Sequence, residues 1–247
     1  MPDFQGKAIL VTGSTRGIGY AIARKLVAQG ATVGIHGRRS ETVHRACESL
    51  ASAGAGRALP LVADFADPES AARAVNDFAA QAGRLDGLVN NAGGGKALPF
   101  RGLTLAQWRA TFAVNVEAAL LATQAAYVIM RGQRAGAIVN IASLAAHGAG
   151  KWMGADYAAS KAALVSMTRS LAQEAARFGI RVNAVSPGMV ETDMTAAIPA
   201  GNRLALGIPL GRFAAPDEIA DAVLFLLSED SAYVTGDVLQ VNGGLGM

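Results

Sequence analysis

The chain has 247 residues, of which 51% are hydrophobic and 17% charged, a composition that fits a globular protein with a substantial core and excludes a disordered chain. The 22 lysines and arginines are scattered and outnumber the 19 acidic residues by three, so a nucleic-acid-binding surface is not expected. Cys47 is the one cysteine, which excludes an internal disulfide and a cysteine-rich zinc site.

The sequence predicts a soluble, cytoplasmic protein. It opens with MPDFQGKAILVTG, which lacks a charged segment followed by an apolar one and a cleavage site. The most apolar long segment, residues 113–130, contains Asn115, Glu117 and Gln124, so it is expected to be a buried helix and not a membrane span. The three histidines lack the spacing of metal ligands, and we predict no metal site.

Short β-branched segments alternate with longer segments of helical period. Seven strands are predicted at KAILVTG (7–13), ATVGIHG (31–37), ALPLVAD (58–64), LDGLVNNAG (85–93), GAIVNIAS (136–143), IRVNAVSPG (180–188) and DVLQVNGG (237–244). Helices are predicted near 17–29, 40–53, 67–82, 104–132, 156–178 and 216–228. This order predicts one doubly wound α/β domain with a parallel sheet covered on both faces, and ligands should bind beyond the carboxyl ends of the strands.

The first predicted strand runs directly into a glycine-rich turn. TGSTRGIG, residues 12–19, opens the first predicted helix and places glycines at 13, 17 and 19. Glycines allow the backbone to approach a pyrophosphate, and a helix N-terminus offers free N–H groups to it. The spacing differs from G-x-G-x-x-G, and an ordinary strand-to-helix turn is the alternative.

The second and third predicted strands bear on the choice of dinucleotide. GATVGIHGRRS ends in Arg38 and Arg39 without an acidic residue, and Arg16 in the glycine turn can add a third positive charge. This pattern favours the 2′-phosphate of NADP(H) over NAD, with solvated loop arginines as the alternative. After the third strand, Asp64 either accepts a hydrogen bond from the adenine amino group or makes a turn or cap before Asp67-Pro68.

DYAASKAAL, residues 156–164, places Tyr157 and Lys161 one helical turn apart. A tyrosine ordinarily loses its proton near pH 10, and a nearby positive charge lowers that pKa. The pair therefore suits proton transfer. The competing interpretation is a core aromatic residue beside a solvated lysine.

A family resemblance is carried by Ser143 and by the segments TGSTRGIG, NNAG (90–93), YAASK (157–161), PGMVETDM (187–194) and VTGDVLQVNGG (234–244). The chain resembles the short-chain dehydrogenase/reductase family over essentially its whole length. The resemblance implies a Rossmann-type seven-stranded sheet forming a single domain over residues 1–247, with a substrate lid near 194–210. It also implies hydride transfer between a nicotinamide and a carbonyl or alcohol, and homo-oligomers, most often tetramers, packed through the helices at 104–132 and 156–178.

The resemblance assigns roles to individual residues. Tyr157 would be the general acid for carbonyl reduction, and Lys161 would hold the nicotinamide ribose and lower the pKa of Tyr157. Ser143 would donate a hydrogen bond to the substrate oxygen, and Asn115 would steady a proton-relay water. Besides Tyr157 and Lys161, the implied cofactor-binding residues are Gly13, Thr15, Arg16, Gly17, Ile18, Gly19, Arg38, Arg39, Asp64, Phe65, Asn91, Ala92, Gly93, Pro187, Gly188, Val190 and Thr192. Leu144, Trp152 and Met153 would join Ser143 and Tyr157 at the substrate.

ETDMTAA (191–197), residues 211–236 and the ending VNGGLGM are similar to the 3-oxoacyl-(acyl-carrier-protein) reductase subgroup. The expected activity is NADP(H)-dependent reduction of a 3-oxoacyl thioester, with Arg134 matching a carrier-docking arginine. At the second docking position stands Phe178, next to Arg177, and the lid is slightly short. A dehydrogenase of a cyclic, aromatic or other secondary alcohol is the alternative, and a non-catalytic dinucleotide-binding sensor or scaffold is a third reading.

Overall fold

The computed structural model describes residues 3–52, 54–148, 153–196, 198 and 206–246. Its centre is a seven-stranded sheet in the order β3-β2-β1-β4-β5-β6-β7, and every neighbouring pair is parallel. The strands are β1 (Ala8–Val11), β2 (Thr32–Gly37), β3 (Arg57–Val62), β4 (Gly87–Asn90), β5 (Gly136–Ile141), β6 (Ile180–Pro187) and β7 (Val238–Val241). All seven predicted strands are confirmed, each shorter than its apolar sequence segment.

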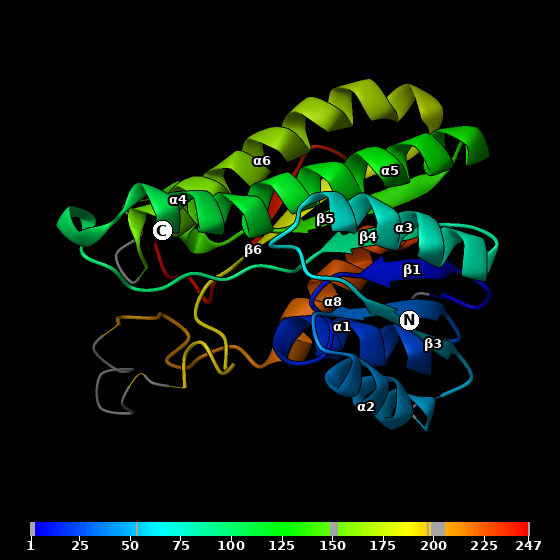
Figure 1. The fold of residues 1–247 in the computed structure, drawn as a ribbon, viewed down its shortest axis with the longest axis horizontal. Coiled ribbons are helices and arrows are strands. Elements are labelled where there is room, and N and C mark those ends of the chain that lie inside the picture. The colour runs from blue at the N-terminus through cyan, green and yellow to red at the C-terminus, as the bar shows by residue number, and fades with distance from the viewer. Residues whose placement is uncertain (1–2, 53, 149–152, 197, 199–205, 247) are drawn as a thin grey trace.

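Helices cover both faces of the sheet (Figure 1). The longer ones are α1 (Gly17–Ala28), α2 (Ser40–Ala51), α3 (Glu69–Ala82), α4 (Leu105–Phe112), α5 (Ala118–Gln133), α6 (Ala155–Ala175) and α8 (Pro216–Leu227). Helices α1, α2 and α8 pack on one face, whereas α3, α5 and α6 pack on the other. The predicted doubly wound Rossmann-type architecture is therefore confirmed.

The sequence of β1 explains how one strand serves two cores. Successive side chains of a strand point to opposite faces. Ile9 and Val11 accordingly belong to the core beneath α1 and α8, whereas Ala8 and Leu10 belong to the core beneath α3 and α5. Because both faces are buried, the strand reads as a continuous apolar segment without polar alternation.

The predicted helix over 104–132 is interrupted. After α4, residues Ala113–Glu117 form a turn of π-helix, and α5 follows directly. Asn115 stands in this turn with its side chain turned inward. It donates to the Gly94 carbonyl at 2.9 Å and accepts from the Gly94 N–H at 3.0 Å. Side-chain bonds of this kind explain the wider turn, a form that is frequent at functional sites.

Among the described residues, Leu105–Gln133 is a segment long and apolar enough to pass as a membrane span, with a mean hydropathy of 1.4. Core helices of soluble domains pass the same criterion. One side of α5 is buried on the sheet through Ala118, Ala122 and Met130, and the other exposes Leu120 and Val128. In the most apolar window of this segment 33% of the residues are buried, and α5 packs against α3 and the sheet.

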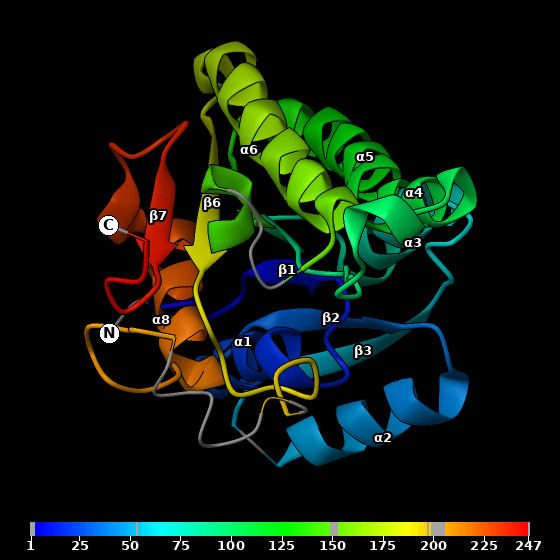
Figure 2. The same cartoon turned by 90° about the vertical axis from the view of Figure 1, so that its left-hand side faces the viewer.

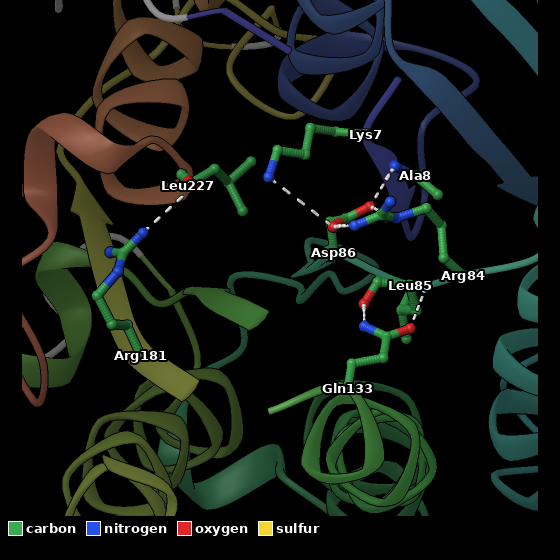
Figure 3. A network of polar contacts seen from close by, with 8 residues as sticks. All are labelled: Lys7, Ala8, Arg84, Leu85, Asp86, Gln133, Arg181 and Leu227. Carbon is green, nitrogen blue, oxygen red and sulfur yellow. Dashed lines mark hydrogen bonds and ion pairs between the residues drawn. The ribbon is translucent and has the colours of Figure 1, made fainter. Parts of the chain in front are cut away.

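A network of polar contacts closes the edge of the sheet where the strands begin (Figure 3). Asp86 accepts from two guanidinium nitrogens of Arg84 at 2.7 Å each and from the Ala8 N–H at 2.8 Å. The Gln133 amide and the Leu85 backbone exchange two hydrogen bonds, of 3.0 and 2.7 Å. Arg181 donates to the last carbonyls of α8, including Leu227 at 3.3 Å. These groups satisfy one another, so we assign this edge a structural role.

The opposite edge, where the strands end, faces the viewer in Figure 2. The chain reverses its direction of winding between β1 and β4, which are neighbours in the sheet although distant in sequence. The segments after β1 and β4 therefore meet at the topological switch point, which is the place where doubly wound sheets bind ligands.

Candidate active site

The glycine turn after β1 is built so that its backbone lies against the segment after β4. Gly13 has φ +64° and Gly17 φ +57°, both in the left-handed region that favours glycine. A Cβ on Gly13 would lie 2.9 Å from the Ala92 Cα, and one on Gly19 would lie 2.4 Å from the Gly13 carbonyl oxygen. The turn therefore requires glycine at 13 and 17 for the backbone conformation, and at 13 and 19 for close approach to neighbouring backbone atoms.

Asn91 ties the same two segments together with its side chain. Its Nδ2 donates to the carbonyls of Thr12 and Gly13 at 2.9 and 3.0 Å, and its backbone N–H donates to the Thr12 hydroxyl at 2.9 Å. The Ala92 N–H also donates to that hydroxyl at 2.9 Å. Asn91 and Ala92 thus support the turn. Thr12, which ends the strand segment, is a supporting residue that the motif analysis did not single out.

The three predicted arginines all have exposed side chains. Arg38 and Arg39 follow β2 as exposed side chains at the start of α2. Arg16 instead donates to the Asp193 carboxylate at 2.7 Å, and both of those side chains are about three-quarters exposed. A surface ion pair of this kind is weak, so Arg16 can exchange its partner at little cost.

Asp64, in the segment after β3, was predicted either to contact the adenine or to make a turn. Its Oδ1 accepts from the Ala66 N–H at 3.0 Å, which makes a turn before α3 begins at Glu69. The turn interpretation therefore holds for that oxygen, and an adenine contact stays a prediction. Phe65 is buried and stacks on His36 with ring centroids 4.0 Å apart, so its side chain is a core residue beneath the predicted adenine pocket.

Tyr157 lies in the first turn of α6 and its side chain is almost fully buried, with 8% exposed. Ser143 follows β5 and forms a hydrogen bond with the Tyr157 phenol. Burial raises the pKa of Tyr157, and the Ser143 hydrogen bond lowers it by a smaller amount, so the pKa is raised overall. The phenol is therefore a proton donor at neutral pH.

Lys161 lies one turn further along α6 and is fully buried. Its ammonium donates to the Ile141 carbonyl at 2.7 Å and lies 5.7 Å from the centre of the Tyr157 ring. Burial lowers the pKa of Lys161 to about 8. The predicted lowering of the Tyr157 pKa by Lys161 is wrong for this structure: burial raises that pKa, and the group that opposes the rise is Ser143.

Asn115 connects the π-turn to α6. Besides its bonds to Gly94, its Nδ2 donates to the Ser160 hydroxyl at 2.9 Å. A Cβ on Gly93 would lie 3.0 Å from the Asn115 Oδ1 and 3.3 Å from the Lys161 ammonium. The structure thus brings Asn115, Gly93 and Lys161 together, as the motifs predicted.

Gly95 is a site residue that the motif analysis did not assign. A Cβ at this position would lie 2.6 Å from Cδ2 of Tyr157 and 2.8 Å from its Cβ. The backbone of the GGGK segment therefore lies directly on the phenol ring. The run of three glycines at 93–95, which opens the GGGK segment (93–96), was the available signal. Its meaning depends on a contact between residues 62 positions apart.

The segment after β6 returns to the glycine turn. A Cβ on Gly188 would lie 2.8 Å from the Asn242 Cα, which fixes the chain as it leaves Pro187 at the end of the strand. Val190 is buried and pairs with Ala214. The methyl group of Thr192 is the nearest atom to a Cβ built on Gly17, at 3.6 Å. Residues 187–192 therefore reach the glycine turn at Gly17.

The predicted substrate residues are placed less completely. Leu144 and Met153 are half-buried, and a Cβ on Gly246 would lie 3.1 Å from Leu144. Trp152 lies outside the described residues, as do 197 and 199–205 of the predicted lid. The described residues around the lid include an apolar cluster of Leu206, Ile208 and Phe213. His147 binds Ser186 across 2.8 Å, which ties the turn after Ser143 to β6.

A glycine turn at the switch point of a parallel sheet, together with Ser143 and the buried Tyr157 and Lys161, defines a dinucleotide-binding oxidoreductase. In the described ranges, no three His, Cys, Asp or Glu side chains are grouped as a metal site.

Comparison with known proteins agrees with this class. The family model described as enoyl-(acyl carrier protein) reductase matches residues 13–246. The chain is 41% identical to 3-oxoacyl-(acyl-carrier-protein) reductase FabG of Aquifex aeolicus over 98% of both chains. It is 39% identical to 3alpha-hydroxysteroid dehydrogenase of Mediterraneibacter gnavus over 97% of this chain and 96% of the other. The chain belongs to the short-chain dehydrogenase/reductase family.

Solved structures support the same assignment. Two crystal structures of a 3-oxoacyl-(acyl-carrier protein) reductase from Brucella melitensis align with TM-scores of 0.93 and 0.91. Both are 35% identical and cover 100% of this chain and 93% of theirs, and the second has NAD bound. The protein is accordingly a nicotinamide-dependent oxidoreductase with a Rossmann-type fold.

Proposed function

We propose that the protein reduces 3-oxoacyl thioesters with NADPH. The observation that carries the proposal is the buried Tyr157 phenol, which keeps its proton and is hydrogen-bonded to Ser143 at the carboxyl edge of the sheet. This pair supplies an acid and a second donor at one point, which is what a carbonyl oxygen needs as it becomes an alcohol.

The residues present fit a nicotinamide dinucleotide. The glycine turn leaves no room for Cβ atoms at Gly13 and Gly19, and such a bare backbone at a helix N-terminus accepts a pyrophosphate. Gly13–Gly19 would hold the pyrophosphate, Asn91–Gly93 would line the pocket, and Lys161 with Thr192 would hold the nicotinamide half. When bound, the cofactor supplies the hydride.

This chain's own residues then orient the substrate and move the proton. Tyr157 donates its phenolic proton to the substrate oxygen, and Ser143 donates a hydrogen bond that stabilises negative charge on the same oxygen. The buried Lys161 ammonium favours the phenolate left behind, because an opposite charge lowers the pKa of a nearby acid. Asn115, held by Gly94 and Ser160, fixes the backbone beside that ammonium.

Preference for NADP(H) is supported by Arg38 and Arg39, which follow β2 as exposed cations where an NAD-binding site would carry an acidic residue. The weak Arg16–Asp193 pair would yield Arg16 to a 2′-phosphate. Replacing Arg38 with Asp should weaken NADPH binding at least tenfold and leave NADH binding within about threefold. Equal loss for both dinucleotides would contradict the preference.

Docking of an acyl carrier protein is supported by a cluster of arginines at the end of α5. The guanidinium carbons of Arg131 and Arg177 lie 5.0 and 4.8 Å from the centre of the Phe178 ring, and Arg134 donates to the Arg177 carbonyl at 3.3 Å. Two guanidinium groups thus lie against the Phe178 ring, and their positive charge would replace that of the arginine missing at position 178. Acidic carrier proteins would be attracted to this patch.

The patch lies where strands begin, because α5 ends at Gln133 and β5 starts at Gly136, whereas the N-terminus of α6 lies at the opposite edge (Figure 1). A docked carrier would therefore deliver its thioester to the catalytic residues of a second copy. We propose a homo-oligomer, most simply a tetramer, packed through α4, α5 and α6, whose exposed apolar side chains include Leu105 and Val128. A soluble, cytoplasmic location is part of the same proposal.

A dehydrogenase of a cyclic secondary alcohol is the second candidate, favoured by the 39% identity to a hydroxysteroid dehydrogenase. NADPH oxidation with acetoacetyl-CoA, cyclic ketones and steroid ketones, each repeated with NADH, separates the two. Turnover on the thioester supports acyl reduction, and turnover on a cyclic ketone alone supports the second candidate. Loss of all turnover in Tyr157→Phe with dinucleotide binding retained would exclude the remaining reading, a non-catalytic binding protein.

For the carrier, Arg134→Glu should slow turnover of the acyl-carrier-protein thioester at least fivefold while sparing the CoA thioester, which lacks the acidic protein. Equal rates on the carrier substrate would remove carrier docking at this patch. Arg45→Glu, an exposed arginine on α2 at the other face of the sheet, is the matched charge control.

A further inference from the structure

His36 is a buried histidine that the motifs of the family leave without a role. It lies in β2, one residue before that strand ends, and its side chain is buried between the ends of β1 and β3. Its ring stacks on Phe65, with ring planes inclined by 21°. The side chain contacts the segments that follow β1 and β3, which are assigned to the pyrophosphate and the adenine of the cofactor.

Both ring nitrogens of His36 are used. The Gly13 N–H donates to Nδ1 at 3.0 Å, so Nδ1 carries no proton. Nε2 lies 3.2 Å from the Ala63 carbonyl oxygen and therefore carries the ring proton and donates to it. The neutral imidazole thus bridges the glycine turn and the segment that begins at Ala63.

The backbone of His36 holds the same turn. The His36 N–H donates to the Ser14 hydroxyl and the Ser14 N–H donates to the His36 carbonyl, both at 3.0 Å. Three bonds therefore join His36 to residues 13 and 14. Two of these bonds join the His36 backbone to Ser14. The third joins the imidazole to Gly13, whose backbone is left-handed.

The neutral form is also the one that this environment favours. Burial lowers the pKa of His36 to about 4, while the bond to the Ala63 carbonyl and the charge of Asp64 oppose that shift. Asp64 is the charged group acting on the ring in this arrangement. At neutral pH the ring can accept from Gly13, which an imidazolium could not do.

We propose that His36 is a positioning residue for the dinucleotide site: its neutral imidazole accepts the hydrogen bond from the Gly13 N–H, holds the glycine turn in its binding conformation and so determines cofactor affinity. The proposal rests on the proposed binding of NADP(H) at this cleft. His36 touches neither the catalytic residues nor the reacting atoms, so its effect belongs to binding and not to the chemical step.

The test compares two variants in the full chain. Leucine fills similar space and removes both hydrogen bonds, whereas asparagine places an acceptor oxygen near the position of Nδ1 and restores the bond from Gly13. His36→Leu should raise the Kd for NADPH about tenfold, as expected for loss of the hydrogen bond that holds Gly13, and raise the KM for NADPH similarly with kcat within about twofold. His36→Asn should return the Kd to within about threefold of wild type.

Hydrogen exchange of the peptide containing Gly13, measured without cofactor, gives a readout independent of activity. It should be faster in His36→Leu and near wild type in His36→Asn. Asn183→Leu is the control for general destabilisation, because Asn183 is equally buried and bonds Val234 and Asp237 between β6 and β7. It should lower Tm without changing the Kd.

An unchanged Kd or unchanged exchange in His36→Leu overturns the proposal, as does a His36→Asn variant as weak as His36→Leu. If His36→Leu fails to fold, the exchange and Kd of His36→Asn against wild type decide the matter, since a loss beyond about tenfold there contradicts the assigned acceptor role. Failure of the wild-type protein to bind NADPH would instead refute the proposed cofactor and is recognised separately.

Discussion

Gly95→Ala isolates the contact between the GGGK segment and the catalytic phenol. The added Cβ would lie 2.6 Å from Cδ2 of Tyr157, and an ordinary contact requires at least 3.4 Å, so the ring or the segment must move by about 0.8 Å. The ring is buried and cannot yield freely. Because a misplacement of about 1 Å can cost roughly 100-fold in rate, we expect kcat for carbonyl reduction to fall about 10- to 100-fold, or about 1.4 to 3 kcal/mol in activation free energy.

The assay is steady-state NADPH oxidation with the best ketone substrate, together with the Kd for NADPH from fluorescence. The matched control is Gly94→Ala, one residue earlier in the same segment, where a Cβ would meet nothing within 4 Å. We expect Gly94→Ala to retain at least half of the wild-type kcat and both variants to bind NADPH normally. Equal kcat values for the two variants would refute the reasoning, because the added methyl group would then have no steric consequence at Tyr157.

Three further predictions concern single groups. Ser143→Ala should lower kcat about 100-fold with an unchanged Kd for NADPH, since it removes a donor to the developing alkoxide, and both are measured as above. Thr111→Val should lower the free energy of unfolding by about 1–3 kcal/mol in a urea titration, because Thr111 donates to the buried Asp156 carboxylate at 2.6 Å. Between pH 6.5 and about 4 the unfolded chain protonates His36 while the folded chain does not, so wild type should lose up to about 3 kcal/mol more stability than His36→Asn as the pH falls. Parallel acid titrations of the two proteins would contradict this last prediction.

The fold was predictable because both signals that specify it are local. Apolar runs bounded by glycines predict buried parallel strands, and Ala-rich segments of helical period predict the crossovers between them. The break in the long helix at Ala113–Glu117 was not predictable in this way. It depends on bonds from Asn115 to Gly94 and Ser160, whose partners are 21 and 45 residues away in the sequence.

The site was predicted as far as motifs mark it. Gly13, Gly17 and Gly19 were recognised from their order, and the structure adds the reasons: close approach to Asn91 at Gly13 and Gly19, and a left-handed conformation at Gly17. The partner of Arg16 was not foreseeable, since Asp193 is 177 residues distant. His36 was passed over for a related reason: a lone histidine in a strand has no visible partners until β1 and β3 are placed beside it.

The opposite pKa shifts of Tyr157 and Lys161 follow from one cause, burial, which disfavours the charged form of each group. The phenol keeps its proton more firmly, and the ammonium, with a pKa near 8, holds its own more loosely. A protonated phenol hydrogen-bonded to Ser143 is the state that reduction of a carbonyl consumes, whereas oxidation of an alcohol needs the phenolate. Near neutral pH the resting phenol is therefore in the form that reduction consumes, and the charge of Lys161 would stabilise the phenolate that remains after the proton has left Tyr157.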